Sequence, residues 1–247
     1  VMRLVSKILF DLFLSSILFI LFLPLLIIFP FLIWYQDRSN PFYIANRVGK
    51  NGRLFKMIKF RTMIFNADKT GIDSTAINDN RITKLGHFIR RYKIDEIPSL
   101  INILKGEMSF VGPRPNVKRE TDLYTNEEKI LLNMKPGITD FSSIVFSDEG
   151  EILKNSENPD LDYNQLIRPW KSRLGIFYVL NHNFFMDLKI LFLTMFMLIN
   201  REYVLYHIHQ FLSKRIDDDQ LLNVLKRKAP LNPYPPPGSD EIVRSRL

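Results

Sequence analysis

The most chemically suggestive feature of the sequence is a pair of adjacent carboxylates, Asp95 and Glu96, in the segment IDEIP. One interpretation is a helix N-terminus, at which Asp95 caps the first turn and Glu96 interacts favourably with the helix dipole. The other is a reactive site, in which one carboxylate attacks a phosphorus centre to form an acyl phosphate while the other helps to hold a metal ion. The residues by themselves leave both interpretations open.

Basic residues near this pair in the sequence suit the second interpretation, because phosphoryl transfer needs cations that neutralise phosphate oxygens. The candidates are Lys59, Arg61, Arg90, Arg91 and Arg114. Arg114 lies between two prolines, which would hold its guanidinium in place for bidentate phosphate binding. Mg²⁺ typically takes one or two carboxylates plus the phosphates of the substrate, so Asp95 and Glu96 would be sufficient protein ligands.

Composition narrows the classes of function. The formal net charge is +8, and seven basic residues without an acid lie between Arg38 and Arg61. Such a patch suits lipid headgroups, nucleotide phosphates or nucleic acid. The absence of cysteine excludes disulfides, thiolate chemistry and cysteine-ligated zinc. The sequence also contains neither a Walker-type phosphate-binding loop nor a dinucleotide-binding glycine motif, and its four histidines do not form a metal set.

The N-terminal segment is apolar enough to enter a membrane. Asp11 and Asp37 bracket 25 uncharged residues, and a spanning helix needs roughly 20. Pro24 lies in the middle and is expected to kink the helix, leaving two halves of roughly 18 Å each. Since basic residues flank both ends, a span would place one cluster on the unfavourable side. Spanning and re-entrant geometries, the second turning at Pro24, therefore both remain open.

The sequence pattern around these residues predicts a mainly helical α+β fold. Residues 42–63 read as a hairpin around Asn51 and Gly52, residues 81–93 as a helix, and Asp95 as the start of another helix with Pro98 in its first turn. We expect loops at 109–115 and 134–140, an irregular acidic insertion at 146–162, and an amphipathic helix from 203 to 216. The apolar helix 184–200 suits either the core or a membrane interface. The Pro-rich residues 229–247 are expected to be disordered.

Several motifs in this order resemble the bacterial sugar transferases that act as monotopic phosphoglycosyl transferases. They are RVGKNGRLFKMIKFRTM, RITKLGHFIRR, DEIPSLINILKGEMSFVGPRP, KPGIT and DLKILFLT, over roughly residues 3–200. The resemblance implies transfer of a sugar-1-phosphate from a nucleotide diphosphate sugar, usually a UDP-sugar, to a polyprenyl phosphate with release of nucleoside monophosphate. It further implies the first membrane step of building a surface glycan, such as lipopolysaccharide, capsule or exopolysaccharide.

The resemblance also assigns roles to residues. Asp95 would be the nucleophile that carries the phosphosugar, Glu96 with Asp95 would hold Mg²⁺, and Pro24 would break a re-entrant helix. The phosphates would be bound by Lys59, Arg61, Arg90 and Arg114. The implied organisation is a re-entrant membrane helix (1–36) in one leaflet of the bacterial inner membrane, a cytoplasmic catalytic domain (37–200), an amphipathic helical extension (201–228) and the Pro-rich tail (229–247). Donor, lipid acceptor and membrane lipids would be its partners, with no nucleic acid; a homodimer stays open.

The sequence departs from the family pattern at several positions. Leu23 and Ala45 stand where relatives often carry serine and glutamine, Asp140 stands where glycine is usual, and the Asn-Gly-Arg stretch of many members is missing. Its arginine lies near the nucleotide, so Arg168 or Arg173 is a candidate replacement. The alternative function is a membrane-anchored basic module that binds phosphate or nucleic acid without catalysis, in which Asp95 is only a cap. The sequence identifies neither the donor sugar nor the glycan.

Overall fold

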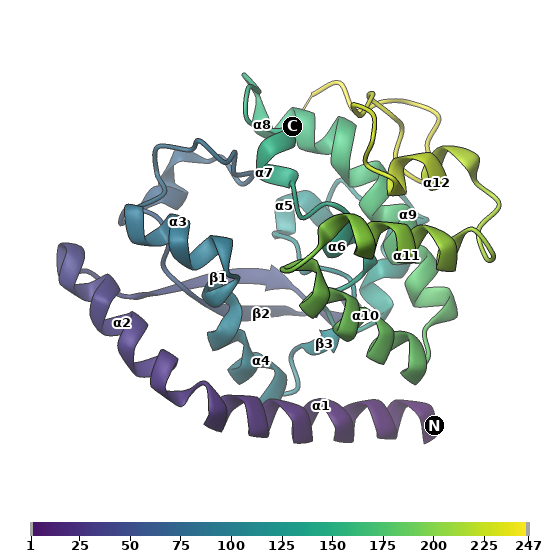
Figure 1. The fold of residues 1–247 in the computed structure, drawn as a ribbon. Helices are drawn as coiled ribbons and strands as arrows, with labels where there is room; N and C mark the ends of the chain where they lie inside the picture. Colours follow the sequence, from purple (N-terminus) through teal and green to yellow (C-terminus); the bar gives the residue numbers. More distant parts are fainter. Residues whose placement is uncertain (1, 246–247) are drawn as a thin grey trace.

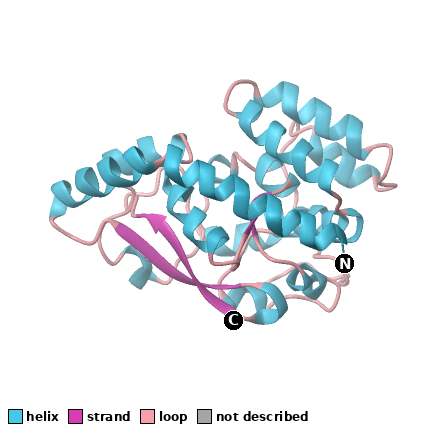
Figure 2. Ribbon diagram, turned by 90° about the horizontal axis from the view of Figure 1, so that it is seen from below, coloured by secondary structure: helices cyan, strands magenta, loops and turns pink. Residues whose placement is uncertain are grey.

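The computed structural model describes residues 2–245 and shows a mainly helical α+β fold with two small sheets (Figures 1 and 2). The α-helices are α1 (Met2–Leu21), α2 (Leu23–Asp37), α3 (Lys84–Arg91), α4 (Leu100–Leu104), α5 (Lys118–Thr121), α6 (Phe141–Val145), α7 (Glu149–Ile152), α8 (Pro159–Asp162), α9 (Arg168–Asn181), α10 (Phe184–Met197), α11 (Arg201–Leu212) and α12 (Asp219–Leu225). Tighter or wider helical turns are η1 (Lys50–Gly52), η2 (Ala67–Thr70), η3 (Ile94–Ser99), η4 (Glu128–Asn133) and the π-helical η5 (Tyr163–Ile167). The strands are β1 (Phe42–Val48), β2 (Leu54–Phe60), β3 (Ser109–Val111) and β4 (Gly137–Thr139).

The apolar N-terminal segment forms two helices, α1 and α2, which run along one side of the molecule and are bent by 59° at Phe22 (Figure 1). Pro24 lies in the first turn of α2. Because proline has no N–H, the carbonyl of Ile20 lacks the donor that a residue at position 24 would otherwise supply. The helical hydrogen-bond pattern is therefore interrupted next to Pro24, where the sequence predicts a kink. Within residues 2–245 no single helix is long and apolar enough to cross a bilayer, whereas this bent pair reaches the required length and composition together.

A buried polar network ties α1 to the rest of the fold. The Lys7 Nζ atom lies 2.5 Å from the Asp187 carboxylate in α10 and donates to the carbonyl of Val111 at 3.0 Å. The hydroxyl of Tyr178 in α9 also donates to Asp187. Further along α1, the Asp11 carboxylate accepts a hydrogen bond from the Phe110 N–H at 3.3 Å. The helix is therefore joined to β3, α9 and α10 by charge as well as by apolar packing.

The predicted hairpin is confirmed. Strands β1 and β2 pair antiparallel from Phe42 opposite Phe60 to Val48 opposite Leu54. Asn51 and Gly52 in the turn have φ values of 56° and 76°, the left-handed region that asparagine and glycine adopt most readily. In the other sheet, β3 and β4 pair in parallel, with Ser109 opposite Gly137. The segments 109–115 and 134–140, expected to be loops, each therefore contribute a short strand.

The main core lies between α4, the hairpin and the helices α6, α9, α10 and α11. Its fully buried side chains include Phe141, Leu174, Tyr178, Ile190 and Ile208. The core prediction for α10 is confirmed for one face of the helix, whereas Phe192 and Met195 on the other face are 59% and 71% exposed. A membrane interface for that face stays a prediction. A second cluster of Phe29, Ile33, Phe60 and Ile89 packs α2 against β2 and α3.

Two sequence predictions on the second half of the chain are wrong. Residues 146–162 are not an irregular insertion, because they contain α7 and α8 and bury Leu153 and Asp160. Residues 229–245 have irregular backbone but contact α9 through Tyr234 and Pro235, whereas residues 246 and 247 of the expected disordered tail lie outside the described residues. The Tyr234 ring stacks on Trp170 at 4.4 Å between centroids, and the carbonyl of Pro235 accepts from Arg173 at 3.0 Å. Proline-rich backbone thus orders where aromatic and arginine side chains bind it.

Residues 201–228 contain the helices α11 and α12. Val204, Leu205 and Ile208 of α11 and Leu221 and Leu225 of α12 belong to the same buried cluster as α6 and α9. The amphipathic helices expected here therefore pack into one core with the preceding residues, and the domain boundary at residue 201 stays a prediction.

Candidate active site

The carboxylate pair lies in η3, which packs against β2 and leads directly into α4. Lys93 precedes it with a φ of 57° and occupies the N-cap position, and no side chain caps this turn. Asp95 and Glu96 are both in the first turn. The prediction that Asp95 caps the helix is therefore wrong.

Glu96 is held by two cations. Lys59 Nζ of β2 lies 2.8 Å from Glu96 Oε1, and Arg114 donates to Oε1 and Oε2 at 2.6 and 3.1 Å. Arg114 also donates to the carbonyl of Ile138 at 2.7 Å, so its guanidinium is held between this carbonyl and Glu96. Burial alone would raise the pKa of Glu96, but Arg114 and Lys59 hold this pKa well below its usual range. Glu96 is thus charged at neutral pH and held by Lys59 and Arg114.

Asp95 differs from its neighbour although the two are adjacent. The nearest cation is Lys59, whose Nζ lies 3.8 Å from Asp95 Oδ2, beyond hydrogen-bond distance. Burial raises the pKa of Asp95, and Glu96 adds to this effect while Lys59 opposes it. The pair therefore combines one tightly bound carboxylate with one carboxylate whose oxygens keep their lone pairs free of close donors, as a nucleophile requires.

The remaining predicted phosphate-binding residues fall into two groups. Arg90 of α3 lines the same space as the pair, donates through Nε to Thr62 Oγ1 at 2.8 Å, and has a pKa lowered by burial. Arg61 instead binds its own chain, with both terminal nitrogens on Asp37 at 2.6 and 2.7 Å and Nε on the Asn40 carbonyl. It joins the end of α2 to the hairpin and also lines the cleft, so its assignment as a phosphate ligand stays a prediction.

These groups line a cleft of about 1290 Å³. Lys59, Arg90, Asp95, Glu96 and Arg114 are among its charged lining residues. Apolar side chains continue the lining to the α1–α2 bend and α10, through Leu18, Phe22, Ile97 and Met197. One continuous space therefore joins a cation-rich region suited to phosphates with an apolar region beside the α1–α2 bend.

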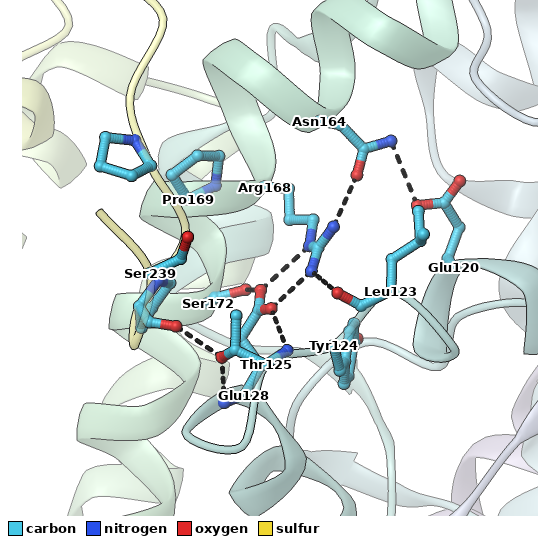
Figure 3. Close-up of polar contacts among 12 residues, drawn as sticks. Glu120, Leu123, Tyr124, Thr125, Glu128, Asn164, Arg168, Pro169, Ser172 and Ser239 are labelled. Atoms are coloured by element: carbon cyan, nitrogen blue, oxygen red, sulfur yellow. Dashed lines mark hydrogen bonds and ion pairs between the residues drawn. The ribbon is translucent and has the colours of Figure 1, made fainter. Parts of the chain in front are cut away.

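The candidate replacements for the missing Asn-Gly-Arg arginine lie elsewhere. Figure 3 shows Arg168 enclosed by Glu128, Asn164 and the carbonyl of Leu123, and this guanidinium is almost completely buried. Arg173 donates to the carbonyls of Pro169 and Pro235. Neither lines the cleft, so both assignments are wrong. Sequence reasoning also missed Arg47, which lines the cleft from β1; its place in the basic run was the available signal.

The carboxylate pair offers few protein ligands for Mg²⁺. Within residues 2–245 no group of three or more acidic or histidine side chains is arranged to hold a metal ion. Glu96 uses three of the roughly four lone-pair sites of a carboxylate on Lys59 and Arg114, which leaves one on Oε2. Asp95 is more open. The set fits a Mg²⁺ ion that takes most of its ligands from substrate phosphates and water.

Fold and site together define a class of protein: a bent apolar helix pair joined to a small α+β domain whose carboxylate pair and cations suit chemistry on phosphate esters. The chain belongs to the bacterial sugar transferase family, whose sequence model matches residues 2–201.

Individual relatives agree with this assignment. An uncharacterized sugar transferase of Haemophilus influenzae is 34% identical over 81% of this chain and 43% of its own length. The undecaprenyl-phosphate galactose phosphotransferase of Salmonella typhimurium is 32% identical over 78% of this chain and 40% of its own. The exopolysaccharide production protein ExoY of Rhizobium meliloti is 32% identical over 76% and 83%. The chain thus spans less than half the length of the first two relatives.

Proposed function

We propose that this protein transfers a sugar-1-phosphate from a nucleotide diphosphate sugar, a UDP-sugar in the first instance, to a polyprenyl phosphate. The observation that supports this proposal best is that two adjacent carboxylates in one cleft differ in the cations that bind them. Glu96 is bound by Lys59 and Arg114, whereas Asp95 has no donor within hydrogen-bond distance of its side chain among the described residues. The printed names of relatives, among them the undecaprenyl-phosphate galactose phosphotransferase, support this substrate class.

The reaction proceeds in two displacements at one phosphorus. A carboxylate oxygen of Asp95 forms a bond to the sugar-bearing phosphorus, and the bond from that phosphorus to the bridging oxygen breaks. The nucleoside monophosphate leaves with the electron pair, so Asp95 carries an acyl phosphosugar. An oxygen of the lipid phosphate then attacks the same phosphorus and releases the Asp95 carboxylate. The product is a sugar diphosphate lipid.

The surrounding charges support this route. Lys59, Arg90 and Arg114 provide preorganised positive charge for the phosphate oxygens on which negative charge accumulates. Glu96 keeps Lys59 and Arg114 in place and, with Asp95, would hold Mg²⁺. When bound, that ion would neutralise charge on the bridging phosphates and assist departure of the monophosphate.

A membrane position follows from the substrates. The donor is water-soluble and the acceptor is buried in lipid, so they meet at an interface. In our proposal α1 and α2 enter one leaflet of the bacterial inner membrane and return on the same side, with the domain on the cytoplasmic face. The exposed apolar side chains of both helices support this arrangement, as does the lining of the cleft by Leu18 and Phe22.

The direct test is the intact mass of the detergent-purified protein after incubation with Mg²⁺ and a panel of UDP-sugars without lipid. We expect a mass gain of one phosphosugar that is absent in Asp95→Asn and present in the control Asp122→Asn, which alters an exposed ion pair with Lys118. Addition of polyprenyl phosphate should then remove the adduct. Release of nucleoside diphosphate would replace the proposal by ordinary glycosyl transfer, and absence of both adduct and lipid product would favour a binding module without catalysis.

A further inference from the structure

A second polar cluster lines the cleft in the region where the family's Asn-Gly-Arg stretch is missing. Ser143, Ser147 and Glu149 come from the segment around α6 and α7, Tyr163 from η5, and Lys171 from α9. None of these residues belongs to the carboxylate pair or to the cations that hold it. The cluster offers a carboxylate, an ammonium group and hydroxyls to whatever occupies the cleft.

The centre of the cluster is the ion pair between Glu149 and Lys171, whose side chains remain 30% and 17% exposed. The Lys171 Nζ atom lies 5.4 Å from the centroid of the Tyr163 ring. Burial, with a contribution from Glu149, raises the pKa of Tyr163 well above its ordinary value, so its hydroxyl stays a donor. Glu149 and Lys171 line the same cleft as Arg90 and Asp95. The cluster therefore shares one space with the residues proposed to bind phosphate.

Two arginines from the C-terminal part of the chain hold the residues that precede Glu149. Arg201 lies 2.9 Å from the Asp148 carboxylate and donates to Ser147 Oγ at 3.0 Å. Arg227 reaches the same carboxylate at 3.1 Å and is itself almost buried. These contacts hold Ser147 and Asp148, the two residues that precede Glu149, and Lys171 pairs with the Glu149 side chain itself. A preorganised polar group of this kind is typical of a specificity subsite.

The chemistry of the cluster selects its ligand. A phosphate would be repelled by Glu149, and an apolar group would leave the ion pair desolvated without compensation. Neighbouring hydroxyls of a sugar fit, because each can donate to the carboxylate and accept from the ammonium or phenol group. We propose that Glu149, Lys171 and Tyr163 form the subsite that binds the hydroxyls of the donor's sugar and so determines which sugar is transferred. This inference rests on the proposed function.

The test uses the first displacement alone, measured as adduct formation against donor concentration without lipid. The donors are UDP-glucose, UDP-galactose and their N-acetylamino counterparts, which differ in hydroxyl configuration or substitution but share the nucleotide. For Glu149→Gln we expect the concentration of the preferred donor that gives half-maximal adduct formation to rise about 10- to 100-fold, because one charge-assisted hydrogen bond is lost. The corresponding concentration for the epimeric donor should change little. Lys171→Met should also reduce the preference, and Lys118→Met, which alters an exposed ion pair outside the cleft, should not.

Three outcomes would overturn the inference. An equal loss for all donors would mean that the cluster does not read the sugar, and unchanged constants would mean that it does not bind the donor. Loss of discrimination between UMP and 2′-deoxy-UMP as inhibitors, with sugar preference intact, would assign the cluster to the ribose. Thermal unfolding of each variant, with Glu149→Asp as a second variant, separates misfolding from these results. If the wild type forms neither an adduct nor a lipid product with any donor, the proposed function itself fails.

Discussion

The bidentate pair of Arg114 and Glu96 yields a quantitative prediction, because both groups are fixed by the same short contacts. Arg114→Met removes hydrogen bonds of 2.6 and 3.1 Å to Glu96 and one of 2.7 Å to the carbonyl of Ile138. Breaking a buried pair costs about 3–5 kcal/mol, and we expect the lower end, about 3 kcal/mol, because Lys59 stays 2.8 Å from Glu96.

The double-mutant cycle sharpens this expectation. Glu96→Gln alone should cost about 2 kcal/mol, because Arg114 keeps the Ile138 carbonyl but loses its charged acceptor. In the double variant no unpaired carboxylate remains, so we expect a total loss of about 3 kcal/mol and a coupling energy of about 2 kcal/mol.

The free energy of unfolding can be measured by urea titration in a nonionic detergent, with the fluorescence of Trp34 and Trp170 as one probe. Coincident transitions by far-UV circular dichroism would justify a two-state treatment. Additive losses, with a coupling below about 0.5 kcal/mol, would refute the reasoning that Arg114 fixes Glu96 as one unit.

Three further predictions follow from individual contacts. Because burial raises the pKa of Asp95, the attacking carboxylate is lost on acidification at a pH above the ordinary 3.8, and the initial rate of adduct formation should fall there. The folded state then binds this proton more tightly than the unfolded state, so charging Asp95 costs stability as pH rises; Asp95→Asn should raise the urea midpoint at pH 7, and a lowered midpoint would contradict this. Tyr234→Ala should lower the free energy of unfolding by about 0.5–1.5 kcal/mol for the lost stacking on Trp170, whereas exposed Asn232→Ala should not. Gly137→Ala would place a Cβ atom 2.1 Å from the backbone nitrogen of Gly112, so we expect no soluble folded protein, and a normal yield and circular dichroism spectrum would disprove this contact.

Local sequence signals predicted the local elements well. Asn51 and Gly52 indicated the hairpin because few other residues adopt positive φ, and the spacing of Leu85 and Ile89 indicated the helix that the structure shows as α3. The family resemblance brought Lys59, Arg90 and Arg114 to the carboxylate pair, where the structure also has them.

Long-range pairing could not be predicted from the sequence. Arg61 resembles the other cations of its run, and only the fold brings Asp37 within 2.6 Å of it. Strands β3 and β4 have three residues each, too few for a periodic signal, and their pairing depends on the close approach of Gly112 and Gly137. The composition of residues 229–247 indicated disorder because a pattern of composition does not register a single aromatic partner such as Trp170.

The network around Lys7 has a consequence for how the protein could work at a bilayer. Lys7 in α1, Asp187 in α10 and Tyr178 in α9 form a buried set of contacts, so rotating the domain about α1 would leave the buried Asp187 carboxylate without its cation. The domain therefore has a fixed tilt relative to the N-terminal helices. In the proposed membrane arrangement the cleft would stay at constant depth, and turnover would rely on lateral diffusion of lipid substrates into a stationary entrance instead of on swivelling of the catalytic domain.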